Sequence, residues 1–353
     1  MASPSPDTPV RPGRVAVTGA TGFIGAHTTK ALLQAGHPVT ALVRDPARLA
    51  ITLAPLGVDP GDLDVVIGDM GDADAVGRAL DDAAAVVHTA AVVSLEKARA
   101  AEVLAANPAG TRMVIEAALA RAIDPVVYVS STASVFRRGL TSLHTDLPPA
   151  ELASAYGRSK AVAETWVRAR QDEGAPIVIT YPASVLGPAA GQAAGEVSAA
   201  VATHLQMGWL PLPKAGWSLV DVRDLAAVHL AVLEAGRGPR RYMCGGTYMT
   251  MAELGVIYRE LTGRRMPALP SSGAALRGLG RAVDALGRYV SFDTIFTGEA
   301  MDMFTGWVPT DDRRTHDELG VAWRDPRQTL EACIRALVDS GRVTAAQAGR
   351  LGL

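Results

Sequence analysis

A strand, a glycine-rich turn and a helix are expected in succession near the start of this 353-residue chain. The turn, Thr18-Gly-Ala-Thr-Gly-Phe-Ile-Gly25, carries glycine at every third position. This spacing permits a tight turn, a close backbone approach to a pyrophosphate and close packing of the helix on the strand. The helix N-terminus adds free N–H groups and a positive partial charge. The turn therefore predicts a nucleotide-binding site whose residues are Gly19, Thr21, Gly22, Phe23, Ile24 and Gly25.

The sequence that follows alternates short apolar runs with alanine-rich stretches of helical character. The apolar runs are nearly continuous, which is typical of parallel strands buried on both faces of a sheet. We expect strands at 14–20, 38–44, 64–70, 84–91, 125–132 and 176–185, and helices at 23–35, 73–80, 98–121 and 156–173. This alternation predicts an α/β protein with a Rossmann-type doubly wound parallel sheet.

The chain divides into three predicted regions. Residues 1–12 are polar and rich in proline, so we expect a disordered segment. Residues 13–186 form the predicted nucleotide-binding domain, and segments near 217–246 return to it. Residues 187–353 form a smaller, mainly helical part that binds the substrate. Within it, residues 273–290 carry leucine and valine at helical spacing with arginine between them, which suits a helix that covers the substrate cleft or the core, or a helix on a membrane surface.

Composition excludes several classes of protein. Lys+Arg is 34 and Asp+Glu is 36, so the net charge of −2 argues against a nucleic-acid partner. No apolar run reaches the roughly 18 residues of a spanning helix, so no integral membrane association is expected. Two cysteines, Cys244 and Cys333, are too few for a disulfide framework or a four-ligand zinc site. We therefore expect a cytoplasmic protein without a metal site.

Tyr156 and Lys160 form the pair that most strongly indicates catalysis. Residues at i and i+4 share one helix face. A free tyrosine has a pKa near 10, and a neighbouring ammonium lowers it by about 1–3 units. The chain has only four lysines, Lys30, Lys97, Lys160 and Lys214, so a chance pairing with tyrosine is rare. We predict that Tyr156 exchanges a proton with the substrate and that Lys160 supports it.

Hydroxyl groups cluster after the fifth predicted strand, in Tyr128-Val-Ser-Ser-Thr-Ala-Ser-Val-Phe136. A hydroxyl there would bind the substrate oxygen and orient it against Tyr156. The catalytic hydroxyl is that of Thr132 if its position is counted from the Val135-Phe136 end of the segment. It is that of Ser131 if its position is counted from the serine pair. Both residues stay open as catalytic candidates, with Thr132 first.

Together these motifs resemble the extended short-chain dehydrogenase/reductase superfamily, also described as the NAD-dependent epimerase/dehydratase family. The likeness covers residues from about 14 to 230, and the segments from 241 onward look like the dihydroflavonol reductase-like bacterial branch. It implies NADP or NAD as cofactor, a small carbonyl or alcohol substrate and a homodimer. It also implies a cofactor site that adds Arg44, Asp69, Met70, Thr89, Ala90, Ala91, Asn107, Tyr156, Lys160, Tyr181, Pro182, Ala183, Ser184 and Val185 to the glycine turn.

The residue after the second strand bears on the choice of cofactor. Arg44 offers a forked guanidinium to a 2′-phosphate, which favours NADP. Asp45 comes one position later and leaves NAD open, because an acidic residue near this strand end can hold the ribose 2′-OH. His88 lies on an apolar run, and we interpret it as a packed core histidine rather than a catalytic one.

Three functions compete. The first is an NADP-dependent oxidoreductase that moves hydride between nicotinamide and a carbonyl or secondary alcohol of a fairly apolar molecule. The second is a nucleotide-sugar epimerase or dehydratase with bound NAD, and the third is a non-catalytic NAD(P)-binding sensor. Residues 187–217 contain no arginine to grip a second diphosphate. Bulky side chains in and after this stretch, Met207, Trp209, Trp217 and Tyr248, suggest an apolar pocket instead.

Overall fold

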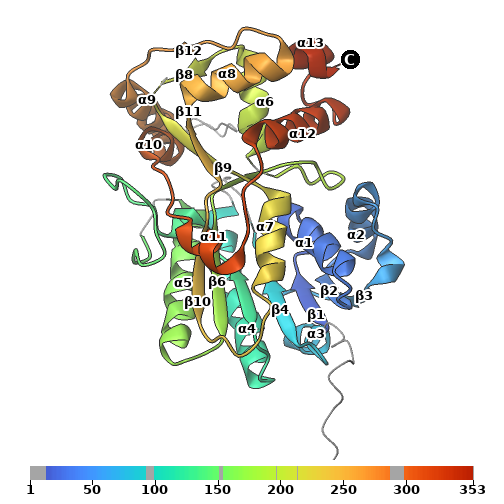
Figure 1. Ribbon diagram of the computed structural model, residues 1–353. Coiled ribbons are helices and arrows are strands. Elements are labelled where there is room, and N and C mark those ends of the chain that lie inside the picture. Colours follow the sequence, from blue (N-terminus) through green and yellow to red (C-terminus); the bar gives the residue numbers. More distant parts are fainter. Residues whose placement is uncertain are drawn as a thin grey trace, which may run out of the picture.

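A seven-stranded parallel sheet lies at the centre of the computed structural model (Figure 1), which describes residues 13–92, 99–150, 154–195, 197–212, 214–286 and 298–352. The strand order is β10-β6-β5-β4-β1-β2-β3, and every adjacent pair is parallel. The strands are β1 Val15–Thr18, β2 Val39–Val43, β3 Asp64–Ile67, β4 Ala85–His88, β5 Val126–Val129, β6 Ile177–Pro182 and β10 Arg240–Cys244. This arrangement confirms the predicted Rossmann-type fold. The predicted disordered segment 1–12 lies outside the described residues.

Strand burial follows position in the sheet. Every residue of β1, β2, β4, β5 and β6 is buried, as the continuous apolar runs predict. The prediction is wrong for β3, where Ile67 is 60% exposed. This strand is the last of an open sheet, so it has a neighbouring strand on one side only.

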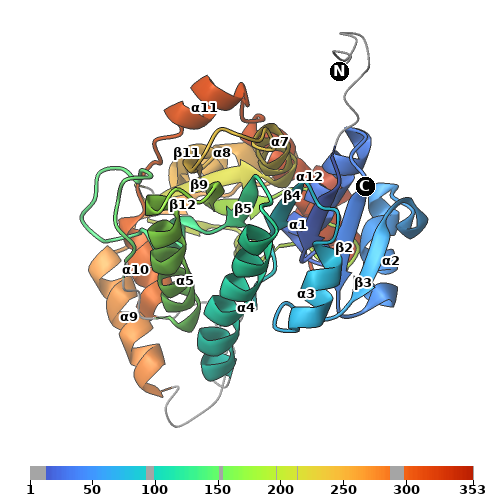
Figure 2. The same cartoon turned by 90° about the horizontal axis from the view of Figure 1, so that it is seen from below.

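Helices cover both faces of the sheet, and α4 and α5 run side by side on one of them (Figure 2). Apolar side chains of α1, α2 and α7 pack on one face, and those of α3, α4 and α5 pack on the other. The helices are α1 Phe23–Gln34, α2 Pro46–Leu53, α3 Ala73–Ala79, α4 Ala100–Ala120, α5 Ala155–Asp172 and α7 Val222–Ala231. The structure adds α2 to the helices predicted before residue 186. Its signal in the sequence is Asp45, an N-cap, followed by proline.

Most of the remaining elements build a second core beyond the carboxyl edge of the sheet (Figure 1), whereas helix α11 (Arg313–Leu319) packs on α7 and β10. One small sheet has the order β11-β9-β7, and another pairs β12 with β8. The strands are β7 Ser184–Leu186, β8 Leu210–Pro211, β9 Gly216–Asp221, β11 Thr247–Thr250 and β12 Ala268–Leu269. The helices are α6 Ser198–Met207, α8 Met251–Thr262, α9 Gly273–Leu286, α10 Gly298–Gly306, α11 Arg313–Leu319, α12 Pro326–Asp339 and α13 Ala345–Ala348. Short 3₁₀ turns occur at η1 Ala54–Leu56, η2 Pro60–Asp62, η4 Thr132–Ser134 and η5 Gly349–Gly352.

The segment 217–246 is shared between the two cores. The helix α7 packs on α1, and β10 extends the seven-stranded sheet. The strand β9 instead pairs with β7 and β11. The assignment of substrate binding to the second core stays a prediction.

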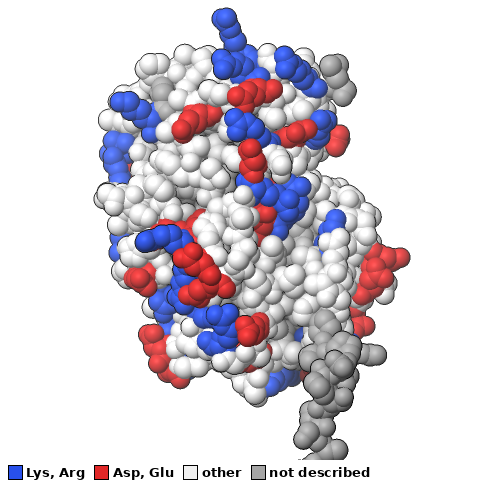
Figure 3. Space-filling model, viewed as in Figure 1, with Lys and Arg blue, Asp and Glu red and all other residues white. Residues whose placement is uncertain are grey.

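The surface mixes charges of both signs, and on the face shown in Figure 3 basic side chains lie beside acidic ones. Helix α9 packs on α10 through an Arg277–Asp302 ion pair of 3.9 Å. Its Leu279 and Leu286 are 49% and 55% exposed, and residues 287–290 of the predicted helix lie outside the described part. Among the described helices, none has the length and apolar character needed to cross a membrane.

Candidate active site

The glycine turn lies at the carboxyl ends of β1 and β4, where the strand order changes direction. Gly19 has φ +81°, a conformation that favours glycine. A Cβ at Gly25 would lie 2.1 Å from the Gly19 carbonyl O, and one at Gly19 would lie 2.6 Å from Thr89 Oγ1. Thr89 in turn donates to the Thr18 carbonyl O at 2.7 Å. This cradle, which side chains would fill, fits the pyrophosphate of a dinucleotide at the start of α1.

Two exposed side chains of opposite charge follow β2 and β3. Arg44 Nε lies 3.8 Å from Asp69 Oδ2. Asp69 also accepts from the Gly71 N–H at 3.0 Å. Asp45 is engaged elsewhere, because its Oδ1 accepts from the N–H groups of Ala47 and Arg48 as the N-cap of α2. The carboxylate of Asp45 is thus used locally, whereas the Arg44 side chain is 72% exposed.

Met70 and His88 are buried next to α4, and His88 also contacts the first residue of the glycine turn. Met70 is buried against α4, where a Cβ at Gly110 would lie 2.6 Å from its sulfur. His88 is 1% exposed and lies between Thr18 Oγ1, 2.7 Å from Nδ1, and Thr111 Oγ1, 3.2 Å from Nε2. Burial lowers the pKa of His88 to about 3. A neutral ring with both nitrogens bonded agrees with the interpretation of a packed core histidine.

Tyr156 lies in the first turn of α5 and is half-buried. The helix begins after Ser154, whose hydroxyl accepts from the Gly157 N–H at 2.9 Å. The free N–H groups and the positive end of the helix dipole therefore lie at the same turn of α5 as Tyr156.

Lys160 lies one turn further along α5, and its side chain is buried. Its Nζ donates to the Val129 carbonyl O at 2.9 Å, at the end of β5, and lies 5.3 Å from the centre of the Tyr128 ring. Burial lowers the pKa of Lys160 to about 8, and the charge of Glu164 opposes this shift. The amine is thereby fixed at the carboxyl edge of the sheet.

Asn107 connects the loop after β4 to the helix that carries Tyr156. Its side-chain oxygen accepts from the Val92 N–H at 2.7 Å, and its Nδ2 donates to the Val92 carbonyl O at 3.0 Å. The same Nδ2 lies 3.0 Å from Ser159 Oγ, which donates to the Tyr156 carbonyl O at 2.8 Å. Ala90 and Ala91 precede Val92 in this loop and are half-buried. Asn107 thus holds the wall of the predicted cofactor site against α5.

The two candidate hydroxyls lie in the turn after β5 and differ in exposure. Thr132 is 1% exposed, and its Oγ1 donates to the Pro182 carbonyl O at 3.2 Å, across to the end of β6. Ser131 is half-buried, and its Oγ accepts from the Ala133 N–H at 3.2 Å as the N-cap of η4. A hydroxyl that accepts one bond still has a hydrogen to donate.

Residues 181–185 of the predicted cofactor site divide between the core and the carboxyl edge of the sheet. The Tyr181 side chain is fully buried, with its hydroxyl bonded to Glu164 and Arg168, so only its backbone follows the edge. The Ala183 N–H donates to the Cys244 carbonyl O at 3.1 Å. Ser184 Oγ accepts from Trp217 Nε1 at 2.6 Å. Val185 lies in β7, so the chain passes here from the central sheet into the second core.

The bulky residues predicted to line an apolar pocket are each half-buried. Trp217 meets the His204 ring edge-on at 5.7 Å, and the Tyr248 ring occupies the space that a Gly216 side chain would fill. Met207 and Trp209 flank the C-terminus of α6. A separate polar cleft of about 480 Å³ contains none of the predicted site residues and is lined by His144, Thr145, Asp146, Asp311, Arg313, Arg314, Asp317 and Glu318.

Sequence reasoning missed a buried polar cluster next to the predicted catalytic pair. Its centre is Glu164, which is fully buried and bonded to Arg168, Ser130 and Ser134. A signal exists in the sequence, because Tyr156, Lys160, Glu164 and Arg168 are spaced by four along one helix. Charged residues on the helix face that also carries the predicted catalytic pair indicate a buried polar face rather than a solvent-exposed one.

Comparison with known proteins agrees with this geometry. A model of the NAD dependent epimerase/dehydratase family matches residues 15–245. Sterol demethylase protein B of Methylococcus capsulatus is 28% identical over 333 residues, which is 93% of this chain and 99% of that protein. Cinnamoyl-CoA reductase 1 of Oryza sativa is 31% identical over 259 residues, which is 70% of this chain and 75% of that protein.

Solved structures share the fold. The crystal structure of gox2253 has a TM-score of 0.76 and 25% identity, and covers 94% of this chain and 99% of its own. MoeE5 in complex with UDP-glucuronic acid and NAD has a TM-score of 0.68 and 24% identity, over 93% of this chain and 100% of its own. The matching family model covers the glycine turn, the Tyr156–Lys160 pair and all seven strands of the parallel sheet. The chain therefore belongs to the NAD dependent epimerase/dehydratase family, within the extended short-chain dehydrogenases/reductases.

Proposed function

We propose that the protein is an NADP-dependent oxidoreductase acting on a carbonyl or secondary alcohol of a fairly apolar small molecule. The observation that carries this proposal is the Tyr156–Lys160 pair on α5, at the same edge of the sheet as the glycine cradle. When bound, the nicotinamide cofactor supplies or takes up the hydride. Relatives named as reductases support a redox reaction over the epimerase and sensor alternatives.

In the proposed mechanism, Tyr156 gives a proton to the substrate oxygen in reduction and takes it back in oxidation. In this mechanism, the ammonium of Lys160 and the positive end of the α5 dipole stabilise the phenolate form of Tyr156 relative to the neutral phenol. A hydroxyl of the turn after β5 orients the substrate oxygen. The glycine turn would hold the pyrophosphate, and the backbone of 181–185 would border the nicotinamide.

The hydroxyl that orients the substrate can be identified by two substitutions. The sequence puts Thr132 first, but its hydrogen is donated to the Pro182 carbonyl O in a buried position, whereas the half-buried Ser131 keeps a hydrogen to donate. We therefore expect Ser131→Ala to lower kcat/KM by about 10²-fold or more, because a missing donor at a developing oxyanion costs about that much. Thr132→Val should cost far less. Steady-state kinetics of both variants with the same carbonyl substrate measures the difference, and the reverse order would return the role to Thr132.

Cofactor choice depends on Arg44 in this proposal. Its exposed guanidinium suits a 2′-phosphate, and Asp45 is already occupied in capping α2. We expect Arg44→Ala to weaken NADPH binding by about tenfold or more and to leave NADH binding nearly unchanged. Fluorescence titration of both nucleotides against both proteins measures this. Equal losses of affinity for NADPH and NADH would show that Arg44 does not bind a 2′-phosphate.

The substrate class is tested by a panel of aldehydes, ketones, hydroxysteroids and UDP-sugars, followed by NADPH absorbance. We expect turnover with apolar carbonyl compounds, because Trp217 and Tyr248 offer aromatic surface near β7 and β9. Conversion of a UDP-sugar without net change in NADPH would favour the epimerase alternative instead. Cofactor binding without turnover of any class would favour the sensor.

A further inference from the structure

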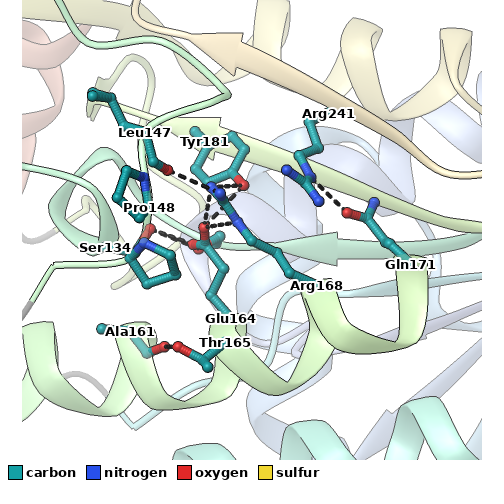
Figure 4. Close-up of polar contacts among 12 residues, drawn as sticks. Ser134, Leu147, Pro148, Ala161, Glu164, Thr165, Arg168, Gln171, Tyr181 and Arg241 are labelled. Carbon is teal, nitrogen blue, oxygen red and sulfur yellow. Dashed lines mark hydrogen bonds and ion pairs between the residues drawn. The ribbon is translucent and has the colours of Figure 1, made fainter. Parts of the chain in front are cut away.

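The buried carboxylate of Glu164 connects three elements of the fold, and Figure 4 shows its contacts with Ser134, Arg168 and Tyr181. Glu164 Oε1 accepts from Arg168 Nε at 2.8 Å and from the Tyr181 hydroxyl at 2.9 Å. Its Oε2 accepts from Ser130 Oγ at 2.7 Å and also from the Ser134 hydroxyl. Arg168 donates further to the Tyr181 hydroxyl at 2.8 Å. The cluster thus links α5, the turn after β5 and strand β6.

The two serines of this cluster enclose the candidate hydroxyls. Ser130 precedes Ser131, and Ser134 follows Thr132 in η4, so Glu164 holds the turn at both ends. On the other side, Tyr181 precedes Pro182, whose carbonyl O accepts from Thr132. The position of the turn relative to α5 is therefore set through one carboxylate.

Glu164 also lies one helical turn from Lys160. The amine of Lys160 lies among the Val129 carbonyl, the Tyr128 ring and the neutral His88 on neighbouring strands, with Tyr156 on its own helix. Among these neighbours, only Glu164 brings a negative charge that favours the ammonium. Arg168 carries the balancing positive charge and lies a further turn away.

We propose that Glu164 is a positioning residue, which holds the turn 130–134 against Tyr156 and Lys160 and supplies the charge opposite the Lys160 ammonium. Its effect on catalysis rests on the function proposed above. Its effect on Lys160 does not, because that effect is measurable without a substrate. Glu164 itself acts through other groups and does not touch the reacting atoms.

The test compares the wild-type protein with three variants. Glu164→Gln keeps the shape of the side chain and removes its charge. Glu164→Gln combined with Arg168→Gln also removes the unpaired guanidinium, so that the double variant folds where the single one is strongly destabilised. Glu116→Gln is the matched control, because Glu116 forms an i,i+4 pair with Arg112 at 2.8 Å on the surface of α4.

Two measurements distinguish a positioning role of Glu164 from an effect on the stability of the protein alone. With only four lysines in the chain, ¹³C-lysine NMR follows the titration of Lys160, whose signal disappears in Lys160→Arg. We expect the titration midpoint of Lys160 to fall in Glu164→Gln and to stay below wild type in the double variant. We also expect kcat to fall at least tenfold in both, at full saturation with substrate and cofactor. The Glu116→Gln protein should match wild type in both measurements.

A folded double variant with wild-type kcat and a wild-type Lys160 midpoint would reduce Glu164 to a structural role and overturn the proposal. Loss of kcat with an unchanged midpoint would overturn the charge contribution and retain the positioning of the turn. If no tested compound is turned over by wild type, the proposed function fails, and the NMR titration still decides the role of Glu164.

Discussion

Replacing Tyr156 by phenylalanine should lower kcat by about 10²- to 10⁴-fold, the range that general acid–base groups contribute. Phenylalanine keeps the ring and its packing in the first turn of α5 but has no proton to exchange. Binding of NADPH should change by less than about threefold, because the glycine cradle is untouched. Stopped-flow or steady-state absorbance at saturating substrate gives kcat, and fluorescence titration gives the cofactor Kd.

Tyr242→Phe is the matched control for this substitution. The Tyr242 hydroxyl donates to Glu318 Oε2 at 2.8 Å, beside α11 and outside the predicted site. Its loss removes one hydrogen bond and should leave kcat unchanged. Full activity in Tyr156→Phe would contradict the mechanism, whereas equal losses in the two variants would point to a general effect on folding.

Replacing Gly25 by alanine should weaken cofactor binding by more than tenfold and lower Tm. The new Cβ would lie 2.1 Å from the Gly19 carbonyl O and 2.7 Å from Thr89 Oγ1. Backbone atoms must move to relieve this contact, and overpacking of this kind costs about 1–3 kcal/mol. The movement displaces the N–H groups that would meet the pyrophosphate. Fluorescence titration with NADPH and thermal unfolding measure the two effects.

Gly278→Ala provides the control, because among the described residues a Cβ at Gly278 in α9 meets no atom within 4 Å beyond the adjacent backbone of its own helix. This substitution should leave cofactor affinity unchanged and raise stability by about 0.5–1 kcal/mol, the usual gain of alanine over glycine inside a helix. Wild-type affinity in Gly25→Ala would show that the turn tolerates a side chain and would remove the close-approach argument.

The strands and helices around the glycine turn could be predicted because their signals are local. The apolar runs identify β1, β2, β4, β5 and β6, and the spacing of glycines identifies the turn between β1 and α1. The core role of His88 could also be read from its apolar run, and both of its ring nitrogens lie near threonine hydroxyls. Such features depend on neighbours in the sequence or on one face of one element.

Other features depend on which segments meet. The exposure of β3 follows from its place at the sheet edge, which no run of apolar residues discloses. The Tyr181 side chain belongs to the core because Glu164 and Arg168 reach it from α5. The sequence predicted a mainly helical part from residue 187 without bounds for its helices, and α6 takes its place there by packing against α12.

By itself, the sequence determined the fold class, the family likeness and the pairing of Tyr156 with Lys160, because each follows from periodicity or short spacing. Only the tertiary structure decided that Asp45 caps a helix while Arg44 stays exposed, and that one buried carboxylate links the turn after β5 to α5 and β6. Hydrogen bonds between distant segments fix these details, and their geometry exists only once the chain is folded.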